Sequence, residues 1–152
     1  MNNETIKSEL KTKGYVIIPG VLNNDEIDEY KNLHKLWRGT IKDHDKLHNS
    51  VDPHGIYKFW EVGQQRFAWK IRTNPKVQSV FKYLWNCEKL ISSFDGSCYI
   101  SKDTTKVDKL WTHTDQAPNR EGLACYQGFV ALTSNKERTL VVYENSHLMH
   151  HL

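Results

Sequence analysis

The sequence predicts an α+β fold, with helices in the first part of the chain and strands in the second. Up to residue 89, apolar side chains recur at the three- and four-residue spacing of amphipathic helices. From residue 90 onward, short β-branched and aromatic runs are separated by turn residues, which is typical of strands. Because the two kinds of element are segregated rather than alternating, the pattern favours α+β over a parallel α/β sheet. The 152 residues fit one domain, mostly helical over 1–89 and strand-forming over 90–152.

The composition is that of a folded protein and excludes several classes of partner. Hydrophobic residues make up 38% and aromatic residues 11% of the chain, which is enough to fill a core. The net charge of +3 is too small to indicate nucleic-acid binding, and no apolar run approaches the roughly 18 residues of a membrane span. The N-terminus lacks the apolar centre of a signal peptide, and the three cysteines include no Cys-x-x-Cys pair. We therefore expect an intracellular, cytoplasmic protein without disulfides that binds neither nucleic acid nor membrane.

Two helices are expected before residue 40. Asn3 can cap the first helix, and Gly14 ends it. A β-branched run that is closed by Pro and Gly follows over residues 15–20. Asn24 can cap the second helix, whose first turn carries two acidic residues and which Gly39 ends.

The middle of the chain contains a polar segment and an aromatic one. Residues 42–55 predict a loop, either a mobile surface excursion or a lid over a binding site. Residues 56–74 are rich in aromatic side chains, and their ambiguous pattern favours a helix. Asn74-Pro75 breaks that pattern, and a further helix with one apolar face is expected over residues 77–85.

The rest of the chain is expected to form strands. The runs at 90–94 and 97–100 flank an Asp-Gly dipeptide, which is typical of a hairpin or of a bulge. Further strands are expected at residues 110–115, 123–133 and 139–143.

His113 and Asp115 are the candidate metal ligands. They are separated by one residue, and a strand places alternate side chains on the same face. One imidazole and one carboxylate on one face are two of the three ligands of the facial triad that binds non-haem Fe(II). A His-x-Asp tripeptide alone is an unspecific signal. It more commonly lies at a solvated strand edge or forms a local His–Asp hydrogen bond.

Four pieces of the sequence, in order along the chain, form a larger pattern, and the second piece contains His113 and Asp115. They are Lys13-Gly14-Tyr15-Val16-Ile17-Ile18-Pro19-Gly20-Val21-Leu22, Trp111-Thr112-His113-Thr114-Asp115-Gln116, Tyr126-Gln127-Gly128-Phe129-Val130-Ala131-Leu132-Thr133 and Thr139-Leu140-Val141-Val142-Tyr143-Glu144-Asn145-Ser146-His147. Together they resemble the phytanoyl-CoA dioxygenase family of Fe(II)- and 2-oxoglutarate-dependent oxygenases. The fourth piece departs from the family pattern, with Thr139 where Gly is usual and Glu144-Asn145 where Pro-Gly is usual.

The resemblance implies a double-stranded β-helix, or jelly roll, with helices packed on its outside. It implies that His113 and Asp115 bind Fe(II) and that Gln127 contacts the cosubstrate 2-oxoglutarate; the alternative for Gln127 is hydrogen bonding within its own sheet. Tyr99 or Cys98 is expected to line the same pocket, with core packing as the alternative. In Trp69-Lys70-Ile71-Arg72, the two cations either bind an anion or lie on the polar face of an amphipathic segment.

The family also needs a late histidine as third ligand and a cation for the distal carboxylate of 2-oxoglutarate. His147, His150 and His151 are the candidates for the third ligand, with His147 the one we assign. The number of strands is too small for a complete barrel, so we expect a fragment of a longer protein, a truncated reading frame, or self-association through exposed strand edges.

The expected function is therefore an Fe(II)/2-oxoglutarate oxygenase acting on a small molecule, or the N-terminal part of one. The alternative is a catalytically inactive relative that serves as a binding or interaction module. The sequence does not identify the substrate.

Overall fold

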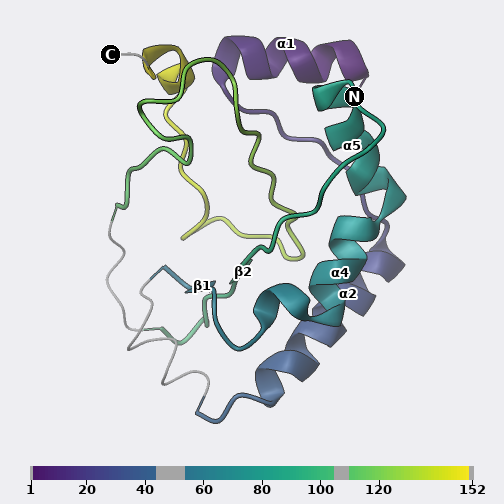
Figure 1. Cartoon of the computed structure of the whole chain (residues 1–152). Helices are drawn as coiled ribbons and strands as arrows, with labels where there is room; N and C mark the ends of the chain where they lie inside the picture. The colour runs from purple at the N-terminus through teal and green to yellow at the C-terminus, as the bar shows by residue number, and fades with distance from the viewer. Residues whose placement is uncertain (1, 44–53, 105–109, 151–152) are drawn as a thin grey trace. The chain divides into compact units, whose positions relative to one another are not determined.

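The computed structural model, drawn as a ribbon in Figure 1, describes residues 2–43, 54–104 and 110–150. The chain divides into two compact units. Unit 1 draws on both ends of the chain, from Met1–Gly20, Leu110–Ala131 and Thr139–Leu152. Unit 2 consists of Val21–Lys109 and Leu132–Arg138. Helices occur together with a two-stranded antiparallel sheet, so the expected α+β class is confirmed.

Helix α1 (Asn3–Lys13) belongs to unit 1 and has a well-defined cap at each end. The side chain of Asn2 accepts a hydrogen bond from the Thr5 N–H at 2.8 Å, so the cap lies one residue before the predicted one. Gly14 ends the helix as predicted, with φ at 86° and its N–H donated to the Leu10 carbonyl oxygen at 3.1 Å. This left-handed conformation is readily adopted by glycine.

Helix α2 (Asn24–Gly39) belongs to unit 2 and begins with a reciprocal capping box. The Asn23 side chain accepts from the Glu26 N–H at 2.9 Å, and the Glu26 carboxylate accepts from the Asn23 N–H at 2.8 Å. The cap is again one residue earlier than predicted, whereas the predicted end at Gly39 is confirmed.

The aromatic segment contains less helix than expected. It begins with strand β1 (Ile56–Tyr57) and the short 3-10 helix η1 (Val62–Gln64), and only then forms helix α4 (Arg66–Thr73). Asn74 separates α4 from α5 (Pro75–Trp85), and its side chain accepts from the Lys76 N–H at 2.9 Å. The predicted break and the predicted final helix are therefore confirmed, whereas the helix prediction is wrong for residues 56–61, and residues 62–64 form only a 3-10 helix.

The hairpin predicted around Asp95-Gly96 does not form. Strand β2 (Ser97–Cys98) pairs instead with β1, with Ile56 opposite Cys98 and Tyr57 opposite Ser97. A Cβ atom on Gly96 would lie 2.7 Å from the Tyr57 carbonyl oxygen, so a glycine is needed for this close approach. Long-range pairing has replaced the local turn that the dipeptide indicated.

The other predicted strands are absent from the described part of the chain. Residues 15–18, 90–94, 110–115, 123–133 and 139–143 form neither helix nor paired strand. A strand needs a neighbouring backbone to receive its hydrogen bonds, and these segments find none among the described residues. Many of their apolar side chains, and others of unit 1, are consequently exposed: Ile17, Leu110, Trp111, Leu123, Phe129, Leu140, Val141, Val142, Tyr143, Leu148 and Met149.

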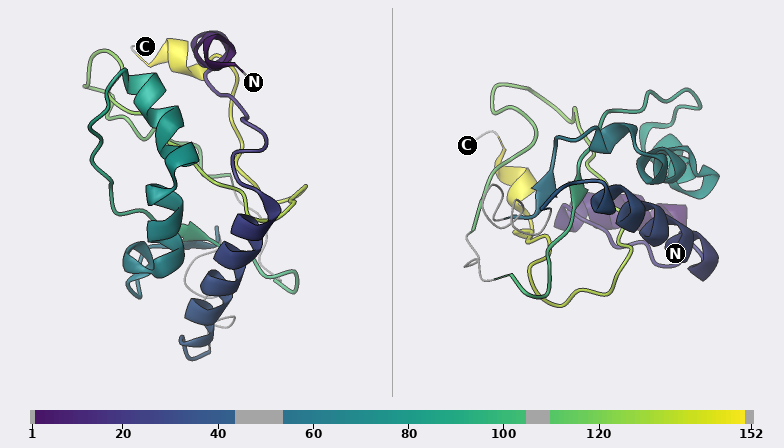
Figure 2. Two further views of the ribbon diagram at one scale, coloured as in Figure 1. Left: turned by 90° about the vertical axis from the view of Figure 1, so that its right-hand side faces the viewer. Right: turned by 90° about the horizontal axis from the view of Figure 1, so that it is seen from below.

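The core of unit 2 lies where α2 and α4 run side by side (Figure 2). Trp37, Tyr57, Val62 and Phe67 are buried together there. The Trp37 indole N–H donates to the carbonyl oxygen of Trp60 at 3.1 Å, so its polar atom is satisfied. In unit 1, Ile6 is the one large apolar side chain that is buried among the described residues.

Three further predictions concern the surface. The side chains of Cys87, Cys98 and Cys125 are exposed, and no disulfide joins these three residues. None of the described helices is both long and apolar enough to cross a membrane. Of the predicted loop at 42–55, residues 44–53 lie outside the described residues, so its proposed role as a lid remains a prediction.

Candidate metal-binding pair

His113 and Asp115 lie together in unit 1, as their spacing predicts. The Nε2 atom of His113 is 3.4 Å from Oδ1 of Asp115. The segment forms neither helix nor paired strand and bends at Asp115, yet the two side chains still meet. Both side chains are close to half exposed, at 45% and 42%, so solutes can reach them.

The ring of His113 is held in one orientation by Trp111. Its Nδ1 atom is 2.8 Å from the Trp111 carbonyl oxygen, and the two rings stack with centroids 4.3 Å apart. A carbonyl oxygen only accepts hydrogen bonds, so Nδ1 carries the proton. In the neutral imidazole, the lone pair of Nε2 therefore faces the carboxylate of Asp115.

The close approach of His113 Nε2 to the Asp115 carboxylate is favourable when a proton or a metal ion is bound at Nε2. Two electron-rich atoms at 3.4 Å repel each other unless a proton or a metal ion is shared between them. Both atoms can reach one ion at metal–ligand distances of about 2.1 Å. A histidine that binds metal through one nitrogen usually donates its other N–H to a carbonyl or carboxylate, as His113 does to Trp111. The pair thus fits two adjacent positions around a divalent metal ion.

No third ligand is brought to this pair by the described residues. Within residues 2–43, 54–104 and 110–150, no three His, Cys, Asp or Glu side chains form a group that could hold a metal ion. His147, the predicted third ligand, points instead at the end of α1, where its Nε2 donates to the Lys11 carbonyl oxygen at 3.0 Å. His151 lies outside the described residues.

The segment around His147 caps α1. The 3-10 helix η2 (Ser146–Met149) lies beside α1 in Figure 1, and the Asn145 N–H donates to the Lys13 carbonyl oxygen at 3.0 Å. The last carbonyl groups of a helix lack partners within it, so these two donors complete the helix end. Since the partners are more than 130 positions apart in the sequence, no local pattern could have revealed this contact.

Tyr15 and Glu144 add a polar contact to the same place. The Tyr15 hydroxyl donates to Oε1 of Glu144 at 2.9 Å. This hydrogen bond, together with the negative charge of Glu144, raises the pKa of the Tyr15 hydroxyl above its ordinary value of 10.0. Residues 144–147 thus contact both the C-terminal end of α1 and Tyr15, which follows that helix.

Gln116, directly after Asp115, is hydrogen-bonded through both ends of its side-chain amide. Its Oε1 accepts from the Ala124 N–H at 2.9 Å, and its Nε2 donates to the carbonyl oxygens of Arg120 and Gly122 at 3.0 and 2.6 Å. The same Nε2 lies 3.2 Å from Nε2 of His150. Gln116 is the last residue of the motif that contains His113 and Asp115, but its sequence position alone indicates no role. Its hydrogen-bond partners depend on how the next eight residues fold.

The predicted cosubstrate residues lie in different units. Gln127, in unit 1, is exposed, and its side chain makes no hydrogen bond to the described residues, so the alternative of bonding within a sheet is not observed. Tyr99, in unit 2, packs against the core, and the guanidinium of Arg38 lies 3.4 Å from the centre of its ring. Cys98 is part of β2 and contacts the His54 carbonyl oxygen at 3.7 Å through Sγ.

Lys70 and Arg72 are engaged by the protein itself. Lys70 pairs with Glu29 on α2 at 2.8 Å. Arg72 lies over the Trp69 ring and donates to the carbonyl oxygens of Ser93 and Gly63. The observed role of these cations is therefore to connect α4 to its neighbours, which agrees with the structural alternative rather than with anion binding.

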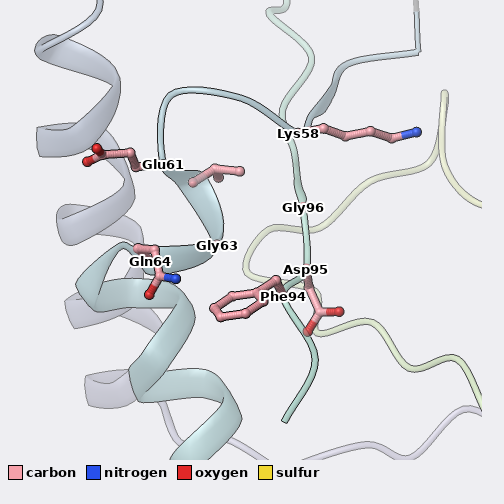
Figure 3. Close-up of a pocket in the computed structure, with 8 residues that line it drawn as sticks. Lys58, Glu61, Gly63, Gln64, Phe94, Asp95 and Gly96 are labelled. Atoms are coloured by element: carbon pink, nitrogen blue, oxygen red, sulfur yellow. The ribbon is translucent and has the colours of Figure 1, made fainter.

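An open pocket of about 480 Å³ lies beside η1 in unit 2 (Figure 3). The Phe94 ring points toward Gln64 and Gly63, while the ammonium group of Lys58 points away from them. None of the predicted site residues lines this pocket.

A polar network that the sequence analysis did not find joins α2 to α5. Lys76 Nζ is 2.8 Å from Oε2 of Glu26, and the Asn74 side chain donates to Oε1 of Glu26 at 3.0 Å and to the Tyr30 hydroxyl at 3.1 Å. The hydrogen bond from Lys76, followed by those from the Asn23 N–H and from Asn74, lowers the pKa of the Glu26 carboxyl to about 2. The network is a structural contact between helices.

Comparison with known proteins gives one partial match. "Ava biosynthesis cluster protein O" of Aspergillus versicolor is 32% identical to this chain over 92 residues, which cover 58% of the chain and 29% of that protein. The chain thus spans less than a third of the length of the curated relative it matches. No protein-family model matches the chain, and no solved structure matches it.

Proposed function

We propose that this chain is the N-terminal part of an Fe(II)- and 2-oxoglutarate-dependent oxygenase of the phytanoyl-CoA dioxygenase type, and that it hydroxylates a small molecule. The observation that carries the proposal is the geometry of His113 and Asp115. Their facing atoms are 3.4 Å apart, and the Nδ1 proton of His113 is committed to the Trp111 carbonyl oxygen. The four sequence pieces that resemble the family support the proposal.

The residues of this chain contribute binding and orientation. His113 and Asp115 hold the iron at two adjacent positions, and Asp115 balances part of its charge. The stacked ring of Trp111 and its carbonyl oxygen keep the His113 ring from turning away. When bound, the metal supplies the oxidative chemistry that protein side chains lack. The third ligand and the cation for 2-oxoglutarate come from outside the described residues, and Gln127 contacts 2-oxoglutarate.

The jelly roll belongs to the same proposal. The segments at 110–115, 123–133 and 139–143 have the composition of strands and expose their apolar side chains. Pairing with further strands of a longer protein buries these side chains and satisfies the backbone. The matched relative is about three times as long as the aligned part, which supports a longer parent protein.

The biological setting is a part of the proposal too. The name of the matched relative refers to a biosynthesis cluster, and we propose that the present protein likewise modifies an intermediate or product of a biosynthetic route inside the cell.

Metal binding tests the proposal directly. Anaerobic equilibrium dialysis of the chain with Fe(II) is expected to show binding that a His113→Ala, Asp115→Ala double variant loses. A His147→Ala variant serves as the matched control, because the structure places that imidazole at the end of α1. Unchanged binding in the double variant overturns the assignment of the pair.

An inactive relative that serves as a binding or interaction module is the second candidate. It is favoured by the absence, among the described residues, of any group of three His, Cys, Asp or Glu side chains that could hold a metal ion. Succinate production from 2-oxoglutarate, measured with Fe(II) and ascorbate, separates the two candidates. Turnover that depends on His113 excludes the inactive module, and its complete absence in the longest expressed form of the protein favours it.

A further inference from the structure

Gln116 lies at the centre of a small hydrogen-bonded loop in unit 1. The amide group of Gln116 binds three backbone groups within residues 120–124, and its Nε2 also lies 3.2 Å from the ring of His150. Donor and acceptor of the amide are used together, in the manner of a peptide group within a sheet. The side chain therefore closes the loop that follows Asp115 without any strand pairing.

A second contact fixes the same residue from the other side. The Thr114 hydroxyl donates to the carbonyl oxygen of Gln116 at 3.0 Å, across Asp115. Both neighbours of Asp115 are therefore hydrogen-bonded. The Thr114 hydroxyl binds the Gln116 carbonyl oxygen, and the Gln116 side-chain amide binds the loop at residues 120–124. Because the direction of a side chain follows from the backbone that carries it, these contacts set where the Asp115 carboxylate points.

We infer that Gln116 is the positioning residue of the His113–Asp115 pair. It holds the carboxylate of Asp115 at its 3.4 Å distance from His113 and does not touch the bound ion itself. The inference rests on the proposed function only in taking a divalent cation as the ligand of the pair. The Nε2 atom of Gln116 also lies 3.2 Å from Nε2 of His150, so the loop approaches the C-terminal segment at this amide.

Two variants separate positioning from general loop stability. Gln116→Ala removes all of the amide contacts. Gln116→Glu keeps an acceptor for the Ala124 N–H and the size of the side chain, but places a carboxylate oxygen against the carbonyl groups of Arg120 and Gly122. Asn119→Ala is the matched control, because it removes an exposed amide of the same loop that has no hydrogen-bond partner among the described residues.

The first readout is Co(II), used as a coloured substitute for Fe(II). We expect Gln116→Ala and Gln116→Glu to weaken Co(II) binding by about 10-fold or more, since partners of metal ligands typically contribute 10- to 100-fold to affinity. The visible Co(II) spectrum is expected to change in both variants and to stay the same in Asn119→Ala. Wild-type affinity and spectrum in a folded Gln116→Glu variant overturn the inference.

The second readout needs no metal and keeps the inference separate from the proposed function. Nitrogen-15 NMR of the imidazoles reports the Nδ1-protonated form of His113 and its response to the neighbouring carboxylate. If the wild-type chain binds no Co(II), the proposed function fails. In that case, a shift of the His113 signals in Gln116→Glu still supports the positioning role. Faster amide exchange at Ala124 would show that the loop has loosened, and unchanged His113 signals in that loosened loop would overturn the role.

Discussion

The Nε2 proton of His147 is donated to the carbonyl oxygen of Lys11, 3.0 Å away, so a histidine of the motif that resembles an oxygenase completes the end of a helix. Its other nitrogen, Nδ1, lies next to Gly14, where an added Cβ atom would be 2.5 Å away. This one side chain therefore supplies one of the donors at the helix end and adds to the left-handed backbone a second reason for glycine at position 14. These contacts make the role of His147 separable by experiment from that of His113.

His147→Ala is expected to lower the free energy of unfolding by about 1 kcal/mol, the usual net value of one hydrogen bond, and to leave Fe(II) affinity unchanged. Urea unfolding and anaerobic metal titration measure the two effects. Met149→Ala, which truncates an exposed side chain of the same short helix η2, is the control and is expected to have a smaller effect on stability. Loss of metal binding without loss of stability would instead make His147 a ligand.

Gly14→Ala is expected to destabilise the protein by about 1–2 kcal/mol for the left-handed backbone alone, with a further cost from the contact with His147. Gly20→Ala is the matched control, since Gly20 also has a positive φ, of 70°, but has no atom within 4 Å of an added Cβ. The excess cost at Gly14 should shrink in a His147→Ala background. Equal costs at the two glycines in thermal unfolding would show that His147 does not occupy this place.

Tyr15 and Glu144 predict a pH effect in the alkaline range. The pKa of Tyr15 is raised by its hydrogen bond to Glu144, so the folded state favours the neutral phenol. The resulting stabilisation is fully present below pH 10.0, the ordinary pKa, and is lost as the pH rises through the higher pKa of the folded state. Glu144→Gln should move the tyrosinate absorbance change of Tyr15 toward lower pH. Tyr15→Phe identifies that signal, and an unshifted titration contradicts the contact.

The ends of the helices could be predicted because they depend on neighbours in the sequence. Gly14 and Gly39 end α1 and α2 as predicted, and an asparagine caps each helix one residue before the predicted position. The closeness of His113 to Asp115 depends on a separation of two residues in the sequence, although the strand that was expected to bring them together does not form. Such features are determined within a few residues.

The features that failed prediction depend on distant partners. Ser97 and Cys98 pair with residues 56–57 rather than across Asp95-Gly96, because Gly96 allows the close approach to Tyr57. The contact between His147 and Lys11 joins positions 136 apart. The segments at 123–133 and 139–143 have the composition of strands without a partner among the described residues, and composition alone does not supply one.

The strongest electrostatic prediction concerns Glu26, whose carboxylate accepts hydrogen bonds from Lys76, from the Asn23 N–H and from Asn74. Its pKa of about 2 in the folded protein lies below the ordinary 4.5, so folding favours the ionised form. The stabilisation is therefore present above pH 4.5 and is lost as the pH falls toward 2. Urea unfolding at a series of pH values should show stability declining across this window.

Glu26→Gln is expected to flatten that decline, because the glutamine side chain does not titrate. It also lowers stability at neutral pH, where the wild-type carboxylate receives its three hydrogen bonds. Lys76→Met changes the same network from helix α5. The pKa of Glu26 should rise in this variant, because the hydrogen bond from Lys76 is the largest cause of the lowered pKa. Asp25→Asn, a change at the adjacent exposed position of the same helical turn, is the control and should leave the acid dependence in place. An acid transition of unchanged steepness in Glu26→Gln would mean that the network joining α2 to α5 does not form in solution.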